Sequence, residues 1–119
     1  MAEPWILFGL PQCDRCRATM KWLRTQGLEV RFVDLRATPP ERTTVSAWLD
    51  QVGSVALVNR RSRTFRQLAP PEEVLQNRQS LIDLLVENPL LIQRPVLIRG
   101  KTLVVGFRAE RDQALVIGD

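Results

Sequence analysis

The chain lacks histidine entirely and contains only two cysteines among its 119 residues. Without histidine it can form neither a Cys-His nucleophile pair nor a His-ligated metal site. Two cysteines alone do not make a structural zinc site either, because such sites use about four Cys or His ligands. No apolar run approaches the roughly 18 residues that a membrane-spanning helix requires, so no membrane partner is expected.

Lysine is also scarce, since Lys21 and Lys101 are the only two and arginine supplies the other basic side chains. The net charge of +4 is modest and spread along the chain, so direct binding of nucleic acid is not expected. The N-terminus lacks the basic segment and cleavage signal of a secreted protein, which makes a cytoplasmic location the default expectation. In that compartment the two cysteines are not expected to form a permanent structural disulfide. The length predicts one domain over residues 1–119.

The apolar pattern predicts alternating strands and helices in the first part of the chain. The expected elements are a buried strand at 5–8, a helix at 14–26 and a second strand at 30–35. This order favours parallel strands joined by a right-handed crossover. Pro39-Pro40 opens a further helix, which Gly53 is expected to end.

The second part is predicted to be helical first and then to return to strands. A short helix runs from Pro70-Pro71 to Gln76, and another runs to Glu87 with Ser80 and Asp83 as its N-terminal cap. Residues 95–98 and 103–105 are predicted to form a hairpin around the intervening turn. Residues 108–117 form either a closing helix or a frayed tail.

The two cysteines, Cys13 and Cys16, form a Cys-x-x-Cys motif between the first predicted strand and the helix that follows. The first N–H groups of a helix have no intrahelical partners and carry partial positive charge, so a thiolate placed there is stabilised. We therefore interpret Cys13 as an attacking thiolate with a lowered pKa, and Arg17 as a further source of positive charge. Cys16 either resolves a mixed disulfide formed at Cys13 or is buried core beneath it.

Several segments resemble the arsenate-reductase-like family, which includes ArsC, Spx and the YffB-type proteins. The segments cover nearly the whole chain: Phe8–Asp14, Thr38–Pro40, Leu57–Leu68, Glu87–Val96 and Leu103–Phe107. The most specific is the last pair, in which Asn88-Pro89 and Arg94-Pro95 precede Val105-Gly106-Phe107. The resemblance implies an α/β fold of thioredoxin-like type, with a β-α-β…β-β-α core and a helical insertion between its two halves.

The resemblance also implies roles for individual residues. Cys13 falls on the nucleophilic cysteine of the family, and Arg94 falls on an arginine that helps arsenate reductases to bind the oxyanion. Arg94 is thereby the alternative to Arg17 as the source of positive charge beside Cys13. Pro95 falls on a proline that is cis in thioredoxin-like folds and faces the active cysteine. An alternative for Arg94 is a surface ion pair with Glu87 or Asp83.

Two positions depart from the pattern of arsenate reductases. Asn59, which Arg60 follows, and Gly106 stand where those enzymes have further arginines. The oxyanion clamp is therefore incomplete, which disfavours arsenate and makes a disulfide sulfur the expected electrophile. Asn59 and Arg60 join Arg94, Pro95 and Arg17 as candidate substrate contacts.

Three functions remain open at this point. The first is a cytoplasmic thiol oxidoreductase without a bound cofactor, which glutathione or a thioredoxin- or glutaredoxin-type protein reduces. The second is an Spx-like redox-sensing transcriptional regulator that binds RNA polymerase and uses its Cys-x-x-Cys disulfide as a switch. The third, disfavoured by the missing arginines, is arsenate reduction.

Overall fold

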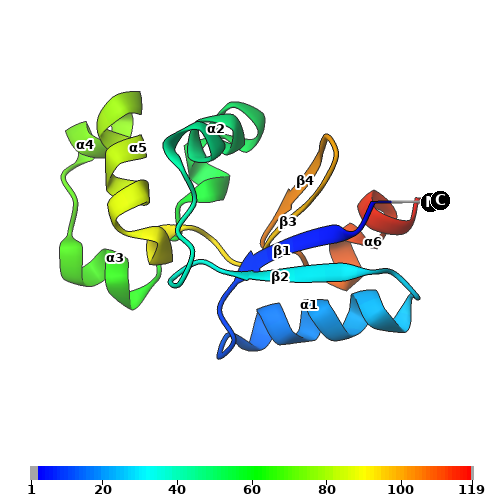
Figure 1. The fold of residues 1–119 in the computed structure, drawn as a ribbon. Coiled ribbons are helices and arrows are strands. Elements are labelled where there is room, and N and C mark those ends of the chain that lie inside the picture. The colour runs from blue at the N-terminus through cyan, green and yellow to red at the C-terminus, as the bar shows by residue number, and fades with distance from the viewer. Residues whose placement is uncertain (1–2, 119) are drawn as a thin grey trace. The chain divides into compact units, whose positions relative to one another are not determined.

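The computed structural model of the chain describes residues 3–118, which form two compact units. The first unit contains the chain up to Asp34 and again from Arg94 onward, and the second is the continuous stretch Leu35–Gln93 (Figure 1). The prediction of one domain over residues 1–119 stays a prediction, because a division into compact units does not measure whether either folds alone.

The first unit contains a four-stranded sheet with two helices. Its elements are β1 (Trp5–Gly9), α1 (Asp14–Thr25), β2 (Val30–Asp34), β3 (Val96–Arg99), β4 (Thr102–Val105) and α6 (Ala109–Ile117). The strand order is β2-β1-β3-β4; β1 and β2 are parallel, whereas β3 is antiparallel to both β1 and β4. The predicted β-α-β unit and the predicted hairpin are therefore both confirmed.

One face of this sheet carries the core of the first unit. Leu7, Leu97 and Val104 are neighbours across β1, β3 and β4, and all three are buried. Leu23 of α1 and Val116 of α6 belong to the same apolar cluster. Figure 1 shows α1 running along β1 and β2. Burying each such side chain stabilises the fold by about 1.5–3 kcal/mol, and this packing fixes α1 against the strand that precedes it.

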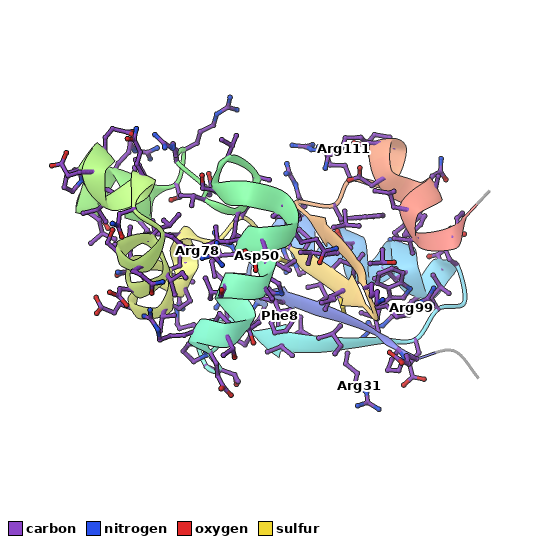
Figure 2. The ribbon with its side chains drawn as sticks, turned by 90° about the horizontal axis from the view of Figure 1, so that it is seen from above. Phe8, Arg31, Asp50, Arg78, Arg99 and Arg111 are labelled. Carbon is purple, nitrogen blue, oxygen red and sulfur yellow. The ribbon has the colours of Figure 1, made fainter. Side chains whose placement is uncertain are left out.

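The second unit is the helical insertion expected between the two halves. It contains α2 (Arg42–Leu57), α3 (Arg63–Leu68), α4 (Glu72–Gln76), α5 (Arg78–Glu87) and the 3-10 turn η1 (Pro89–Leu91). The guanidinium of Arg78 on α5 lies 2.8 Å from the carboxylate of Asp50 on α2 (Figure 2). Val58, which directly follows α2, and Ile92, near the end of the unit, form an isolated antiparallel bridge.

Two predicted details of the second unit are wrong. Gly53 does not end α2; it has φ +81 and ψ 166 inside a helix that resumes and runs to Leu57. Ser80 with Asp83 is not the cap of α5, because the helix begins at Arg78 and the side chain of Asn77 accepts a hydrogen bond from Ser80 N–H. The Asp83 carboxylate pairs instead with Arg42 of α2.

The fold is the thioredoxin-like α/β arrangement, in which the β-α-β half precedes the helical insertion in the sequence and the β-β-α half follows it. The closing segment is the helix α6 rather than a frayed tail. Among the described residues, no helix combines the length and the apolar character needed to cross a membrane.

Candidate functional site

Cys13 lies where the chain leaves β1 and enters α1. The Cys13 N–H donates to the Leu10 carbonyl at 3.1 Å, which closes the turn after the strand. Cys13 has extended backbone angles and is the N-cap of α1, and its carbonyl accepts the first helical hydrogen bond, from Arg17 N–H at 3.0 Å. The thiol is thus half-buried at the helix N-terminus, as the motif predicted.

The surroundings of Cys13 lower the pKa of its thiol below the usual 9.0. Burial acts in the opposite direction, but four other interactions outweigh it. They are hydrogen bonds from the backbone and the side chain of Cys16, the positive charge of Arg94, and a hydrogen bond from the backbone of Arg15. The helix N-terminal amides and Arg94 therefore stabilise the thiolate, as predicted for an attacking cysteine.

Cys16 is in the opposite situation, since it is buried in the core of the first unit. Burial, its hydrogen bond to Cys13 and the negative charge of Cys13 raise the pKa of the Cys16 thiol to about 12. A hydrogen bond from the backbone of Leu10 and the charge of Arg94 oppose that rise. Neither cysteine is in a disulfide, and the hydrogen bond from the Cys16 thiol is one of the interactions that lower the pKa of Cys13.

Gly9 makes room for the buried sulfur of Cys16, a role that was not predicted from the sequence. A Cβ at position 9 would overlap Cys16 Sγ and would lie 3.2 Å from Cys16 Cβ. The last residue of β1 must therefore lack a side chain for Cys16 to lie where it does. A glycine between the apolar strand and the Cys-x-x-Cys motif was the available signal.

Arg94 and Pro95 belong to the same unit as the two cysteines. The Arg94–Pro95 peptide bond is cis, as the resemblance implied, and Pro95 is buried. The Pro95 carbonyl accepts a hydrogen bond from Gly106 N–H at 2.7 Å, which joins the segments before β3 and after β4. The charge of Arg94 acts on both thiols. Whether Arg94 and Pro95 also contact a substrate stays a prediction.

The other three candidate contacts have partners of their own. Arg17 pairs with Asp14 at 2.9 Å on the exposed side of α1, and it is not among the groups that shift the pKa of Cys13. Asn59 and Arg60 lie in the second unit. The Asn59 side-chain oxygen accepts from Arg61 N–H at 3.1 Å, and Arg60 pairs with Glu72 at 2.7 Å. Their substrate contacts stay predictions.

Within residues 3–118, no group of three or more cysteine and carboxylate side chains is placed to hold a metal ion. The geometry offers the chemistry of two thiols at the start of one helix: the half-buried Cys13, whose pKa is lowered, and the buried Cys16, whose pKa is raised to about 12.

Comparisons with known proteins agree on one family. The sequence model of the ArsC family matches residues 8–115. The chain is 31% identical to the regulatory protein MgsR of Bacillus subtilis over 110 residues, which cover 90% of this chain and 86% of MgsR. It is 28% identical to the global transcriptional regulator Spx of Streptococcus pyogenes over 115 residues, covering 95% and 85%. A solved structure titled YFFB protein superposes with a TM-score of 0.83 at 27% identity, covering 94% of this chain and 98% of that one. The chain therefore belongs to the ArsC family.

Proposed function

We propose that the protein is a thiol-dependent oxidoreductase in which Cys13 attacks a disulfide and Cys16 completes its reduction. The observation that carries this proposal is the asymmetry of the pair. The pKa of Cys13 is lowered, whereas the pKa of Cys16 is raised to about 12. At neutral pH Cys13 is therefore favoured as the nucleophile, whereas Cys16 is favoured as a neutral thiol that reacts second.

In the first step the Cys13 thiolate attacks one sulfur of the substrate disulfide. A Cys13–substrate disulfide forms, and the second substrate sulfur leaves as a thiolate that takes a proton from solvent. Arg94 favours the anionic form of Cys13 before the attack, since its charge lowers the pKa of that thiol.

In the second step Cys16 releases the product. Burial still raises the pKa of Cys16, but the hydrogen bond to the Cys13 side chain and the Cys13 negative charge no longer do so once Cys13 is bonded to substrate. The Cys16 thiol then loses its proton to solvent and its sulfur attacks Cys13 Sγ. The first substrate sulfur leaves as a thiolate that takes a proton from solvent, and the two cysteines of the chain become a disulfide.

A reductant must then supply two electrons to convert the Cys13–Cys16 disulfide back to two thiols. Two glutathione thiols, or one dithiol of thioredoxin or glutaredoxin type, reduce the Cys13–Cys16 disulfide and are themselves oxidised to a disulfide. No resident cofactor takes part in this cycle.

Arsenate is not the acceptor that the site favours. Gly106 has no side chain at the position where the arsenate reductases that this chain resembles have an arginine. The nearby Arg111 guanidinium already donates hydrogen bonds to the Gly106 carbonyl and to Asp112. Asn59 likewise carries no charge. An oxyanion is held best by several charge-assisted contacts, which these positions do not supply.

The test is turnover with glutathione as the electron donor and bis(2-hydroxyethyl) disulfide as the acceptor. We expect multiple turnovers that require Cys13 and are lost in Cys13→Ser, whereas arsenate supplied in place of the disulfide is not reduced. A rate with protein equal to the rate without it would contradict the proposal.

A redox-sensing regulator is the second candidate, and the likeness to proteins named MgsR and Spx favours it. In this case the Cys13–Cys16 disulfide switches the affinity for RNA polymerase instead of serving turnover. Retention on a column of immobilised RNA polymerase, dependent on the redox state of the pair and without disulfide turnover, would favour the regulator over the enzyme.

A further inference from the structure

A groove of about 690 Å³ lies along α1 in the first unit. Its apolar lining comes from Leu10 and Pro11 in the turn before the helix, from Met20 on α1, and from Phe32 on β2. β2 is an edge strand of the sheet, and the Phe32 side chain is 37% exposed. The unit thus presents a concave apolar surface beside the candidate thiol site.

The charged residues that line this groove are all positive. Arg17, Lys21 and Arg24 recur on successive turns of α1 and therefore follow one side of the helix. Among the described residues, no aspartate or glutamate lines the groove. Asp14 offsets part of the charge of Arg17, with which it pairs at 2.9 Å. Lys21 and Arg24 extend the positive edge along the helix away from the thiols.

We propose that this groove docks an acidic peptide segment of a protein substrate, with one apolar side chain of that segment seated between α1 and β2. The inference rests on the proposed function, and it deepens that function by naming the substrate class. The charge complementarity favours carboxylates opposite Lys21 and Arg24, while the apolar lining favours a leucine- or phenylalanine-like anchor.

The apolar lining argues for a peptide over the other polyanions. A nucleic acid would satisfy the cations with phosphates but has no aliphatic side chain for the surface of Met20 and Phe32. An anionic membrane requires apolar groups that protrude into the lipid, whereas these side chains line a concave surface.

The groove is continuous with the turn that positions the attacking thiol. Leu10 and Pro11 line one end of it, and the Leu10 carbonyl accepts the Cys13 N–H at 3.1 Å. Cys16 also contributes to the lining. A segment bound along α1 therefore ends beside the two cysteines, where a substrate sulfur a few residues away can meet Cys13.

Binding can be tested without any redox chemistry. The probe is a fluorescein-labelled peptide of glutamates around a central Leu-Phe pair, and its matched partner carries lysines in place of the glutamates. Fluorescence anisotropy with the reduced full chain is expected to show tighter binding of the acidic peptide, and added salt is expected to weaken it because the charges are exposed.

Three variants locate the site: a double charge reversal in the groove, a charge reversal outside it and a replacement of the apolar Phe32. Lys21→Glu combined with Arg24→Glu is expected to weaken the acidic peptide about tenfold, as for two lost exposed charge pairs. Arg31→Glu, a single charge reversal, is the control and is expected to leave binding unchanged, because Arg31 lies next to Phe32 in β2, is not part of the groove and extends outward from the sheet edge (Figure 2). Phe32→Ser tests the apolar anchor site and is expected to weaken binding without changing charge.

Three results would overturn the docking proposal. They are equal affinity for the acidic and the basic peptide, equal weakening by the Arg31 control, and stronger binding to duplex DNA or to vesicles of anionic lipid than to the acidic peptide.

A second arm tests the substrate class. Each peptide is prepared with a glutathione-blocked cysteine next to the charged segment, and the rate of reduction by the chain is compared with that of bis(2-hydroxyethyl) disulfide. We expect faster reduction of the acidic peptide than of the basic one. Equal rates for both peptides, with the small disulfide still reduced, would overturn the substrate class alone. No reaction with any disulfide would instead overturn the proposed function.

Discussion

Cys13 and Cys16 are three residues apart on one helix, yet their surroundings move the pKa values of their thiols in opposite directions. Cys13 is half-buried at the N-cap, where hydrogen bonds and Arg94 favour the anion. Cys16 is 1% exposed, and burial is the largest cause that favours its neutral form. The proposed roles, Cys13 as the nucleophile and Cys16 as the resolving thiol, therefore rest on where each cysteine lies at the start of the helix.

The first prediction concerns the pH dependence of alkylation. Because the pKa of Cys13 is lowered from 9.0, its reaction with iodoacetamide should reach half of its maximum rate below pH 9.0. Cys16, with a pKa of about 12, should remain unmodified in the folded chain over the same range. Mass spectrometry of the alkylated peptides measures both. A midpoint for Cys13 at or above pH 9.0 would contradict the assignment.

A second prediction concerns Gly9, whose missing side chain leaves space for the sulfur of Cys16. Gly9→Ala should displace Cys16, slow the formation of the Cys13–Cys16 disulfide, and destabilise the fold by about 1–3 kcal/mol through overpacking. Stopped-flow measurement of disulfide formation and denaturant unfolding give the two quantities.

The matched control is Gly27→Ala at the end of α1. Gly27 has φ +75, and a Cβ there would meet no atom within 4 Å. This change should cost about 1 kcal/mol through backbone strain, without slowing disulfide formation. Equal slowing in both variants would show that lost stability, and not the position of Cys16, is responsible.

At the scale of elements, α6 depends on one buried carboxylate. Asp112 is 6% exposed, and its side chain accepts from the N–H of the N-cap residue Arg108 at 3.0 Å. The Arg111 guanidinium contacts the two carboxylate oxygens at 2.8 and 2.7 Å. These bonds satisfy an amide at the start of the helix that would otherwise lack an intrahelical partner.

The third prediction is that Asp112→Asn lowers the free energy of unfolding by about 1–3 kcal/mol, since it leaves buried polar groups imperfectly paired. The hydrogen bond from Arg111 is the main cause that lowers the pKa of Asp112 below its usual 3.8, burial opposes it, and the Arg108 N–H adds to it. The stabilisation is therefore fully present above pH 3.8 and is lost as the pH falls through the folded-state pKa.

Urea unfolding at several pH values measures this linkage. In Asp112→Asn the loss of stability below pH 3.8 should be smaller than in the unaltered chain. Glu110→Gln is the control on the same helix, because Glu110 is exposed and its change should leave the acid dependence as it was. An unchanged acid dependence in Asp112→Asn would contradict the role of this carboxylate.

Most elements were predictable from the sequence because apolar spacing and helix-ending residues are local signals. The strand at Trp5–Gly9 and the helix at Asp14–Thr25 follow directly from such spacing. Helix boundaries were less predictable where two polar residues competed for one role. Asn77 and Ser80 are both residue types that favour the N-cap position. Which of them becomes the N-cap of α5 depends on tertiary packing, which the sequence pattern does not predict.

At the scale of the whole molecule, the groups that set the pKa of Cys13 all belong to one compact unit. Arg15 and Cys16 lie within three residues of Cys13, whereas Arg94 follows the 59-residue insertion Leu35–Gln93. The sequence motif could locate the first two, but Arg94 was predictable only through a resemblance, because no local pattern indicates that residues so far apart meet.

The fourth prediction uses this separation. Arg94→Gln removes a positive charge that lowers the pKa of Cys13, so the alkylation midpoint should move to higher pH. Arg63→Gln removes an exposed arginine of α3 in the second unit, which is not among the causes of the shift, and should leave the midpoint in place. A midpoint that moves equally in both variants would mean that net charge, and not Arg94 itself, acts on the thiol.

The most direct test of the central claim, that Cys13 attacks and Cys16 resolves, is to trap the intermediate. Reduced Cys16→Ser is mixed with a limiting amount of bis(2-hydroxyethyl) disulfide and followed by intact and peptide mass spectrometry. The account predicts a stable adduct on Cys13, whereas the unaltered chain passes through this adduct and ends as the Cys13–Cys16 disulfide, two hydrogens lighter. Two results would contradict this claim. One is release of the adduct from Cys16→Ser as fast as from the unaltered chain, and the other is an initial adduct on Cys16 in the unaltered chain.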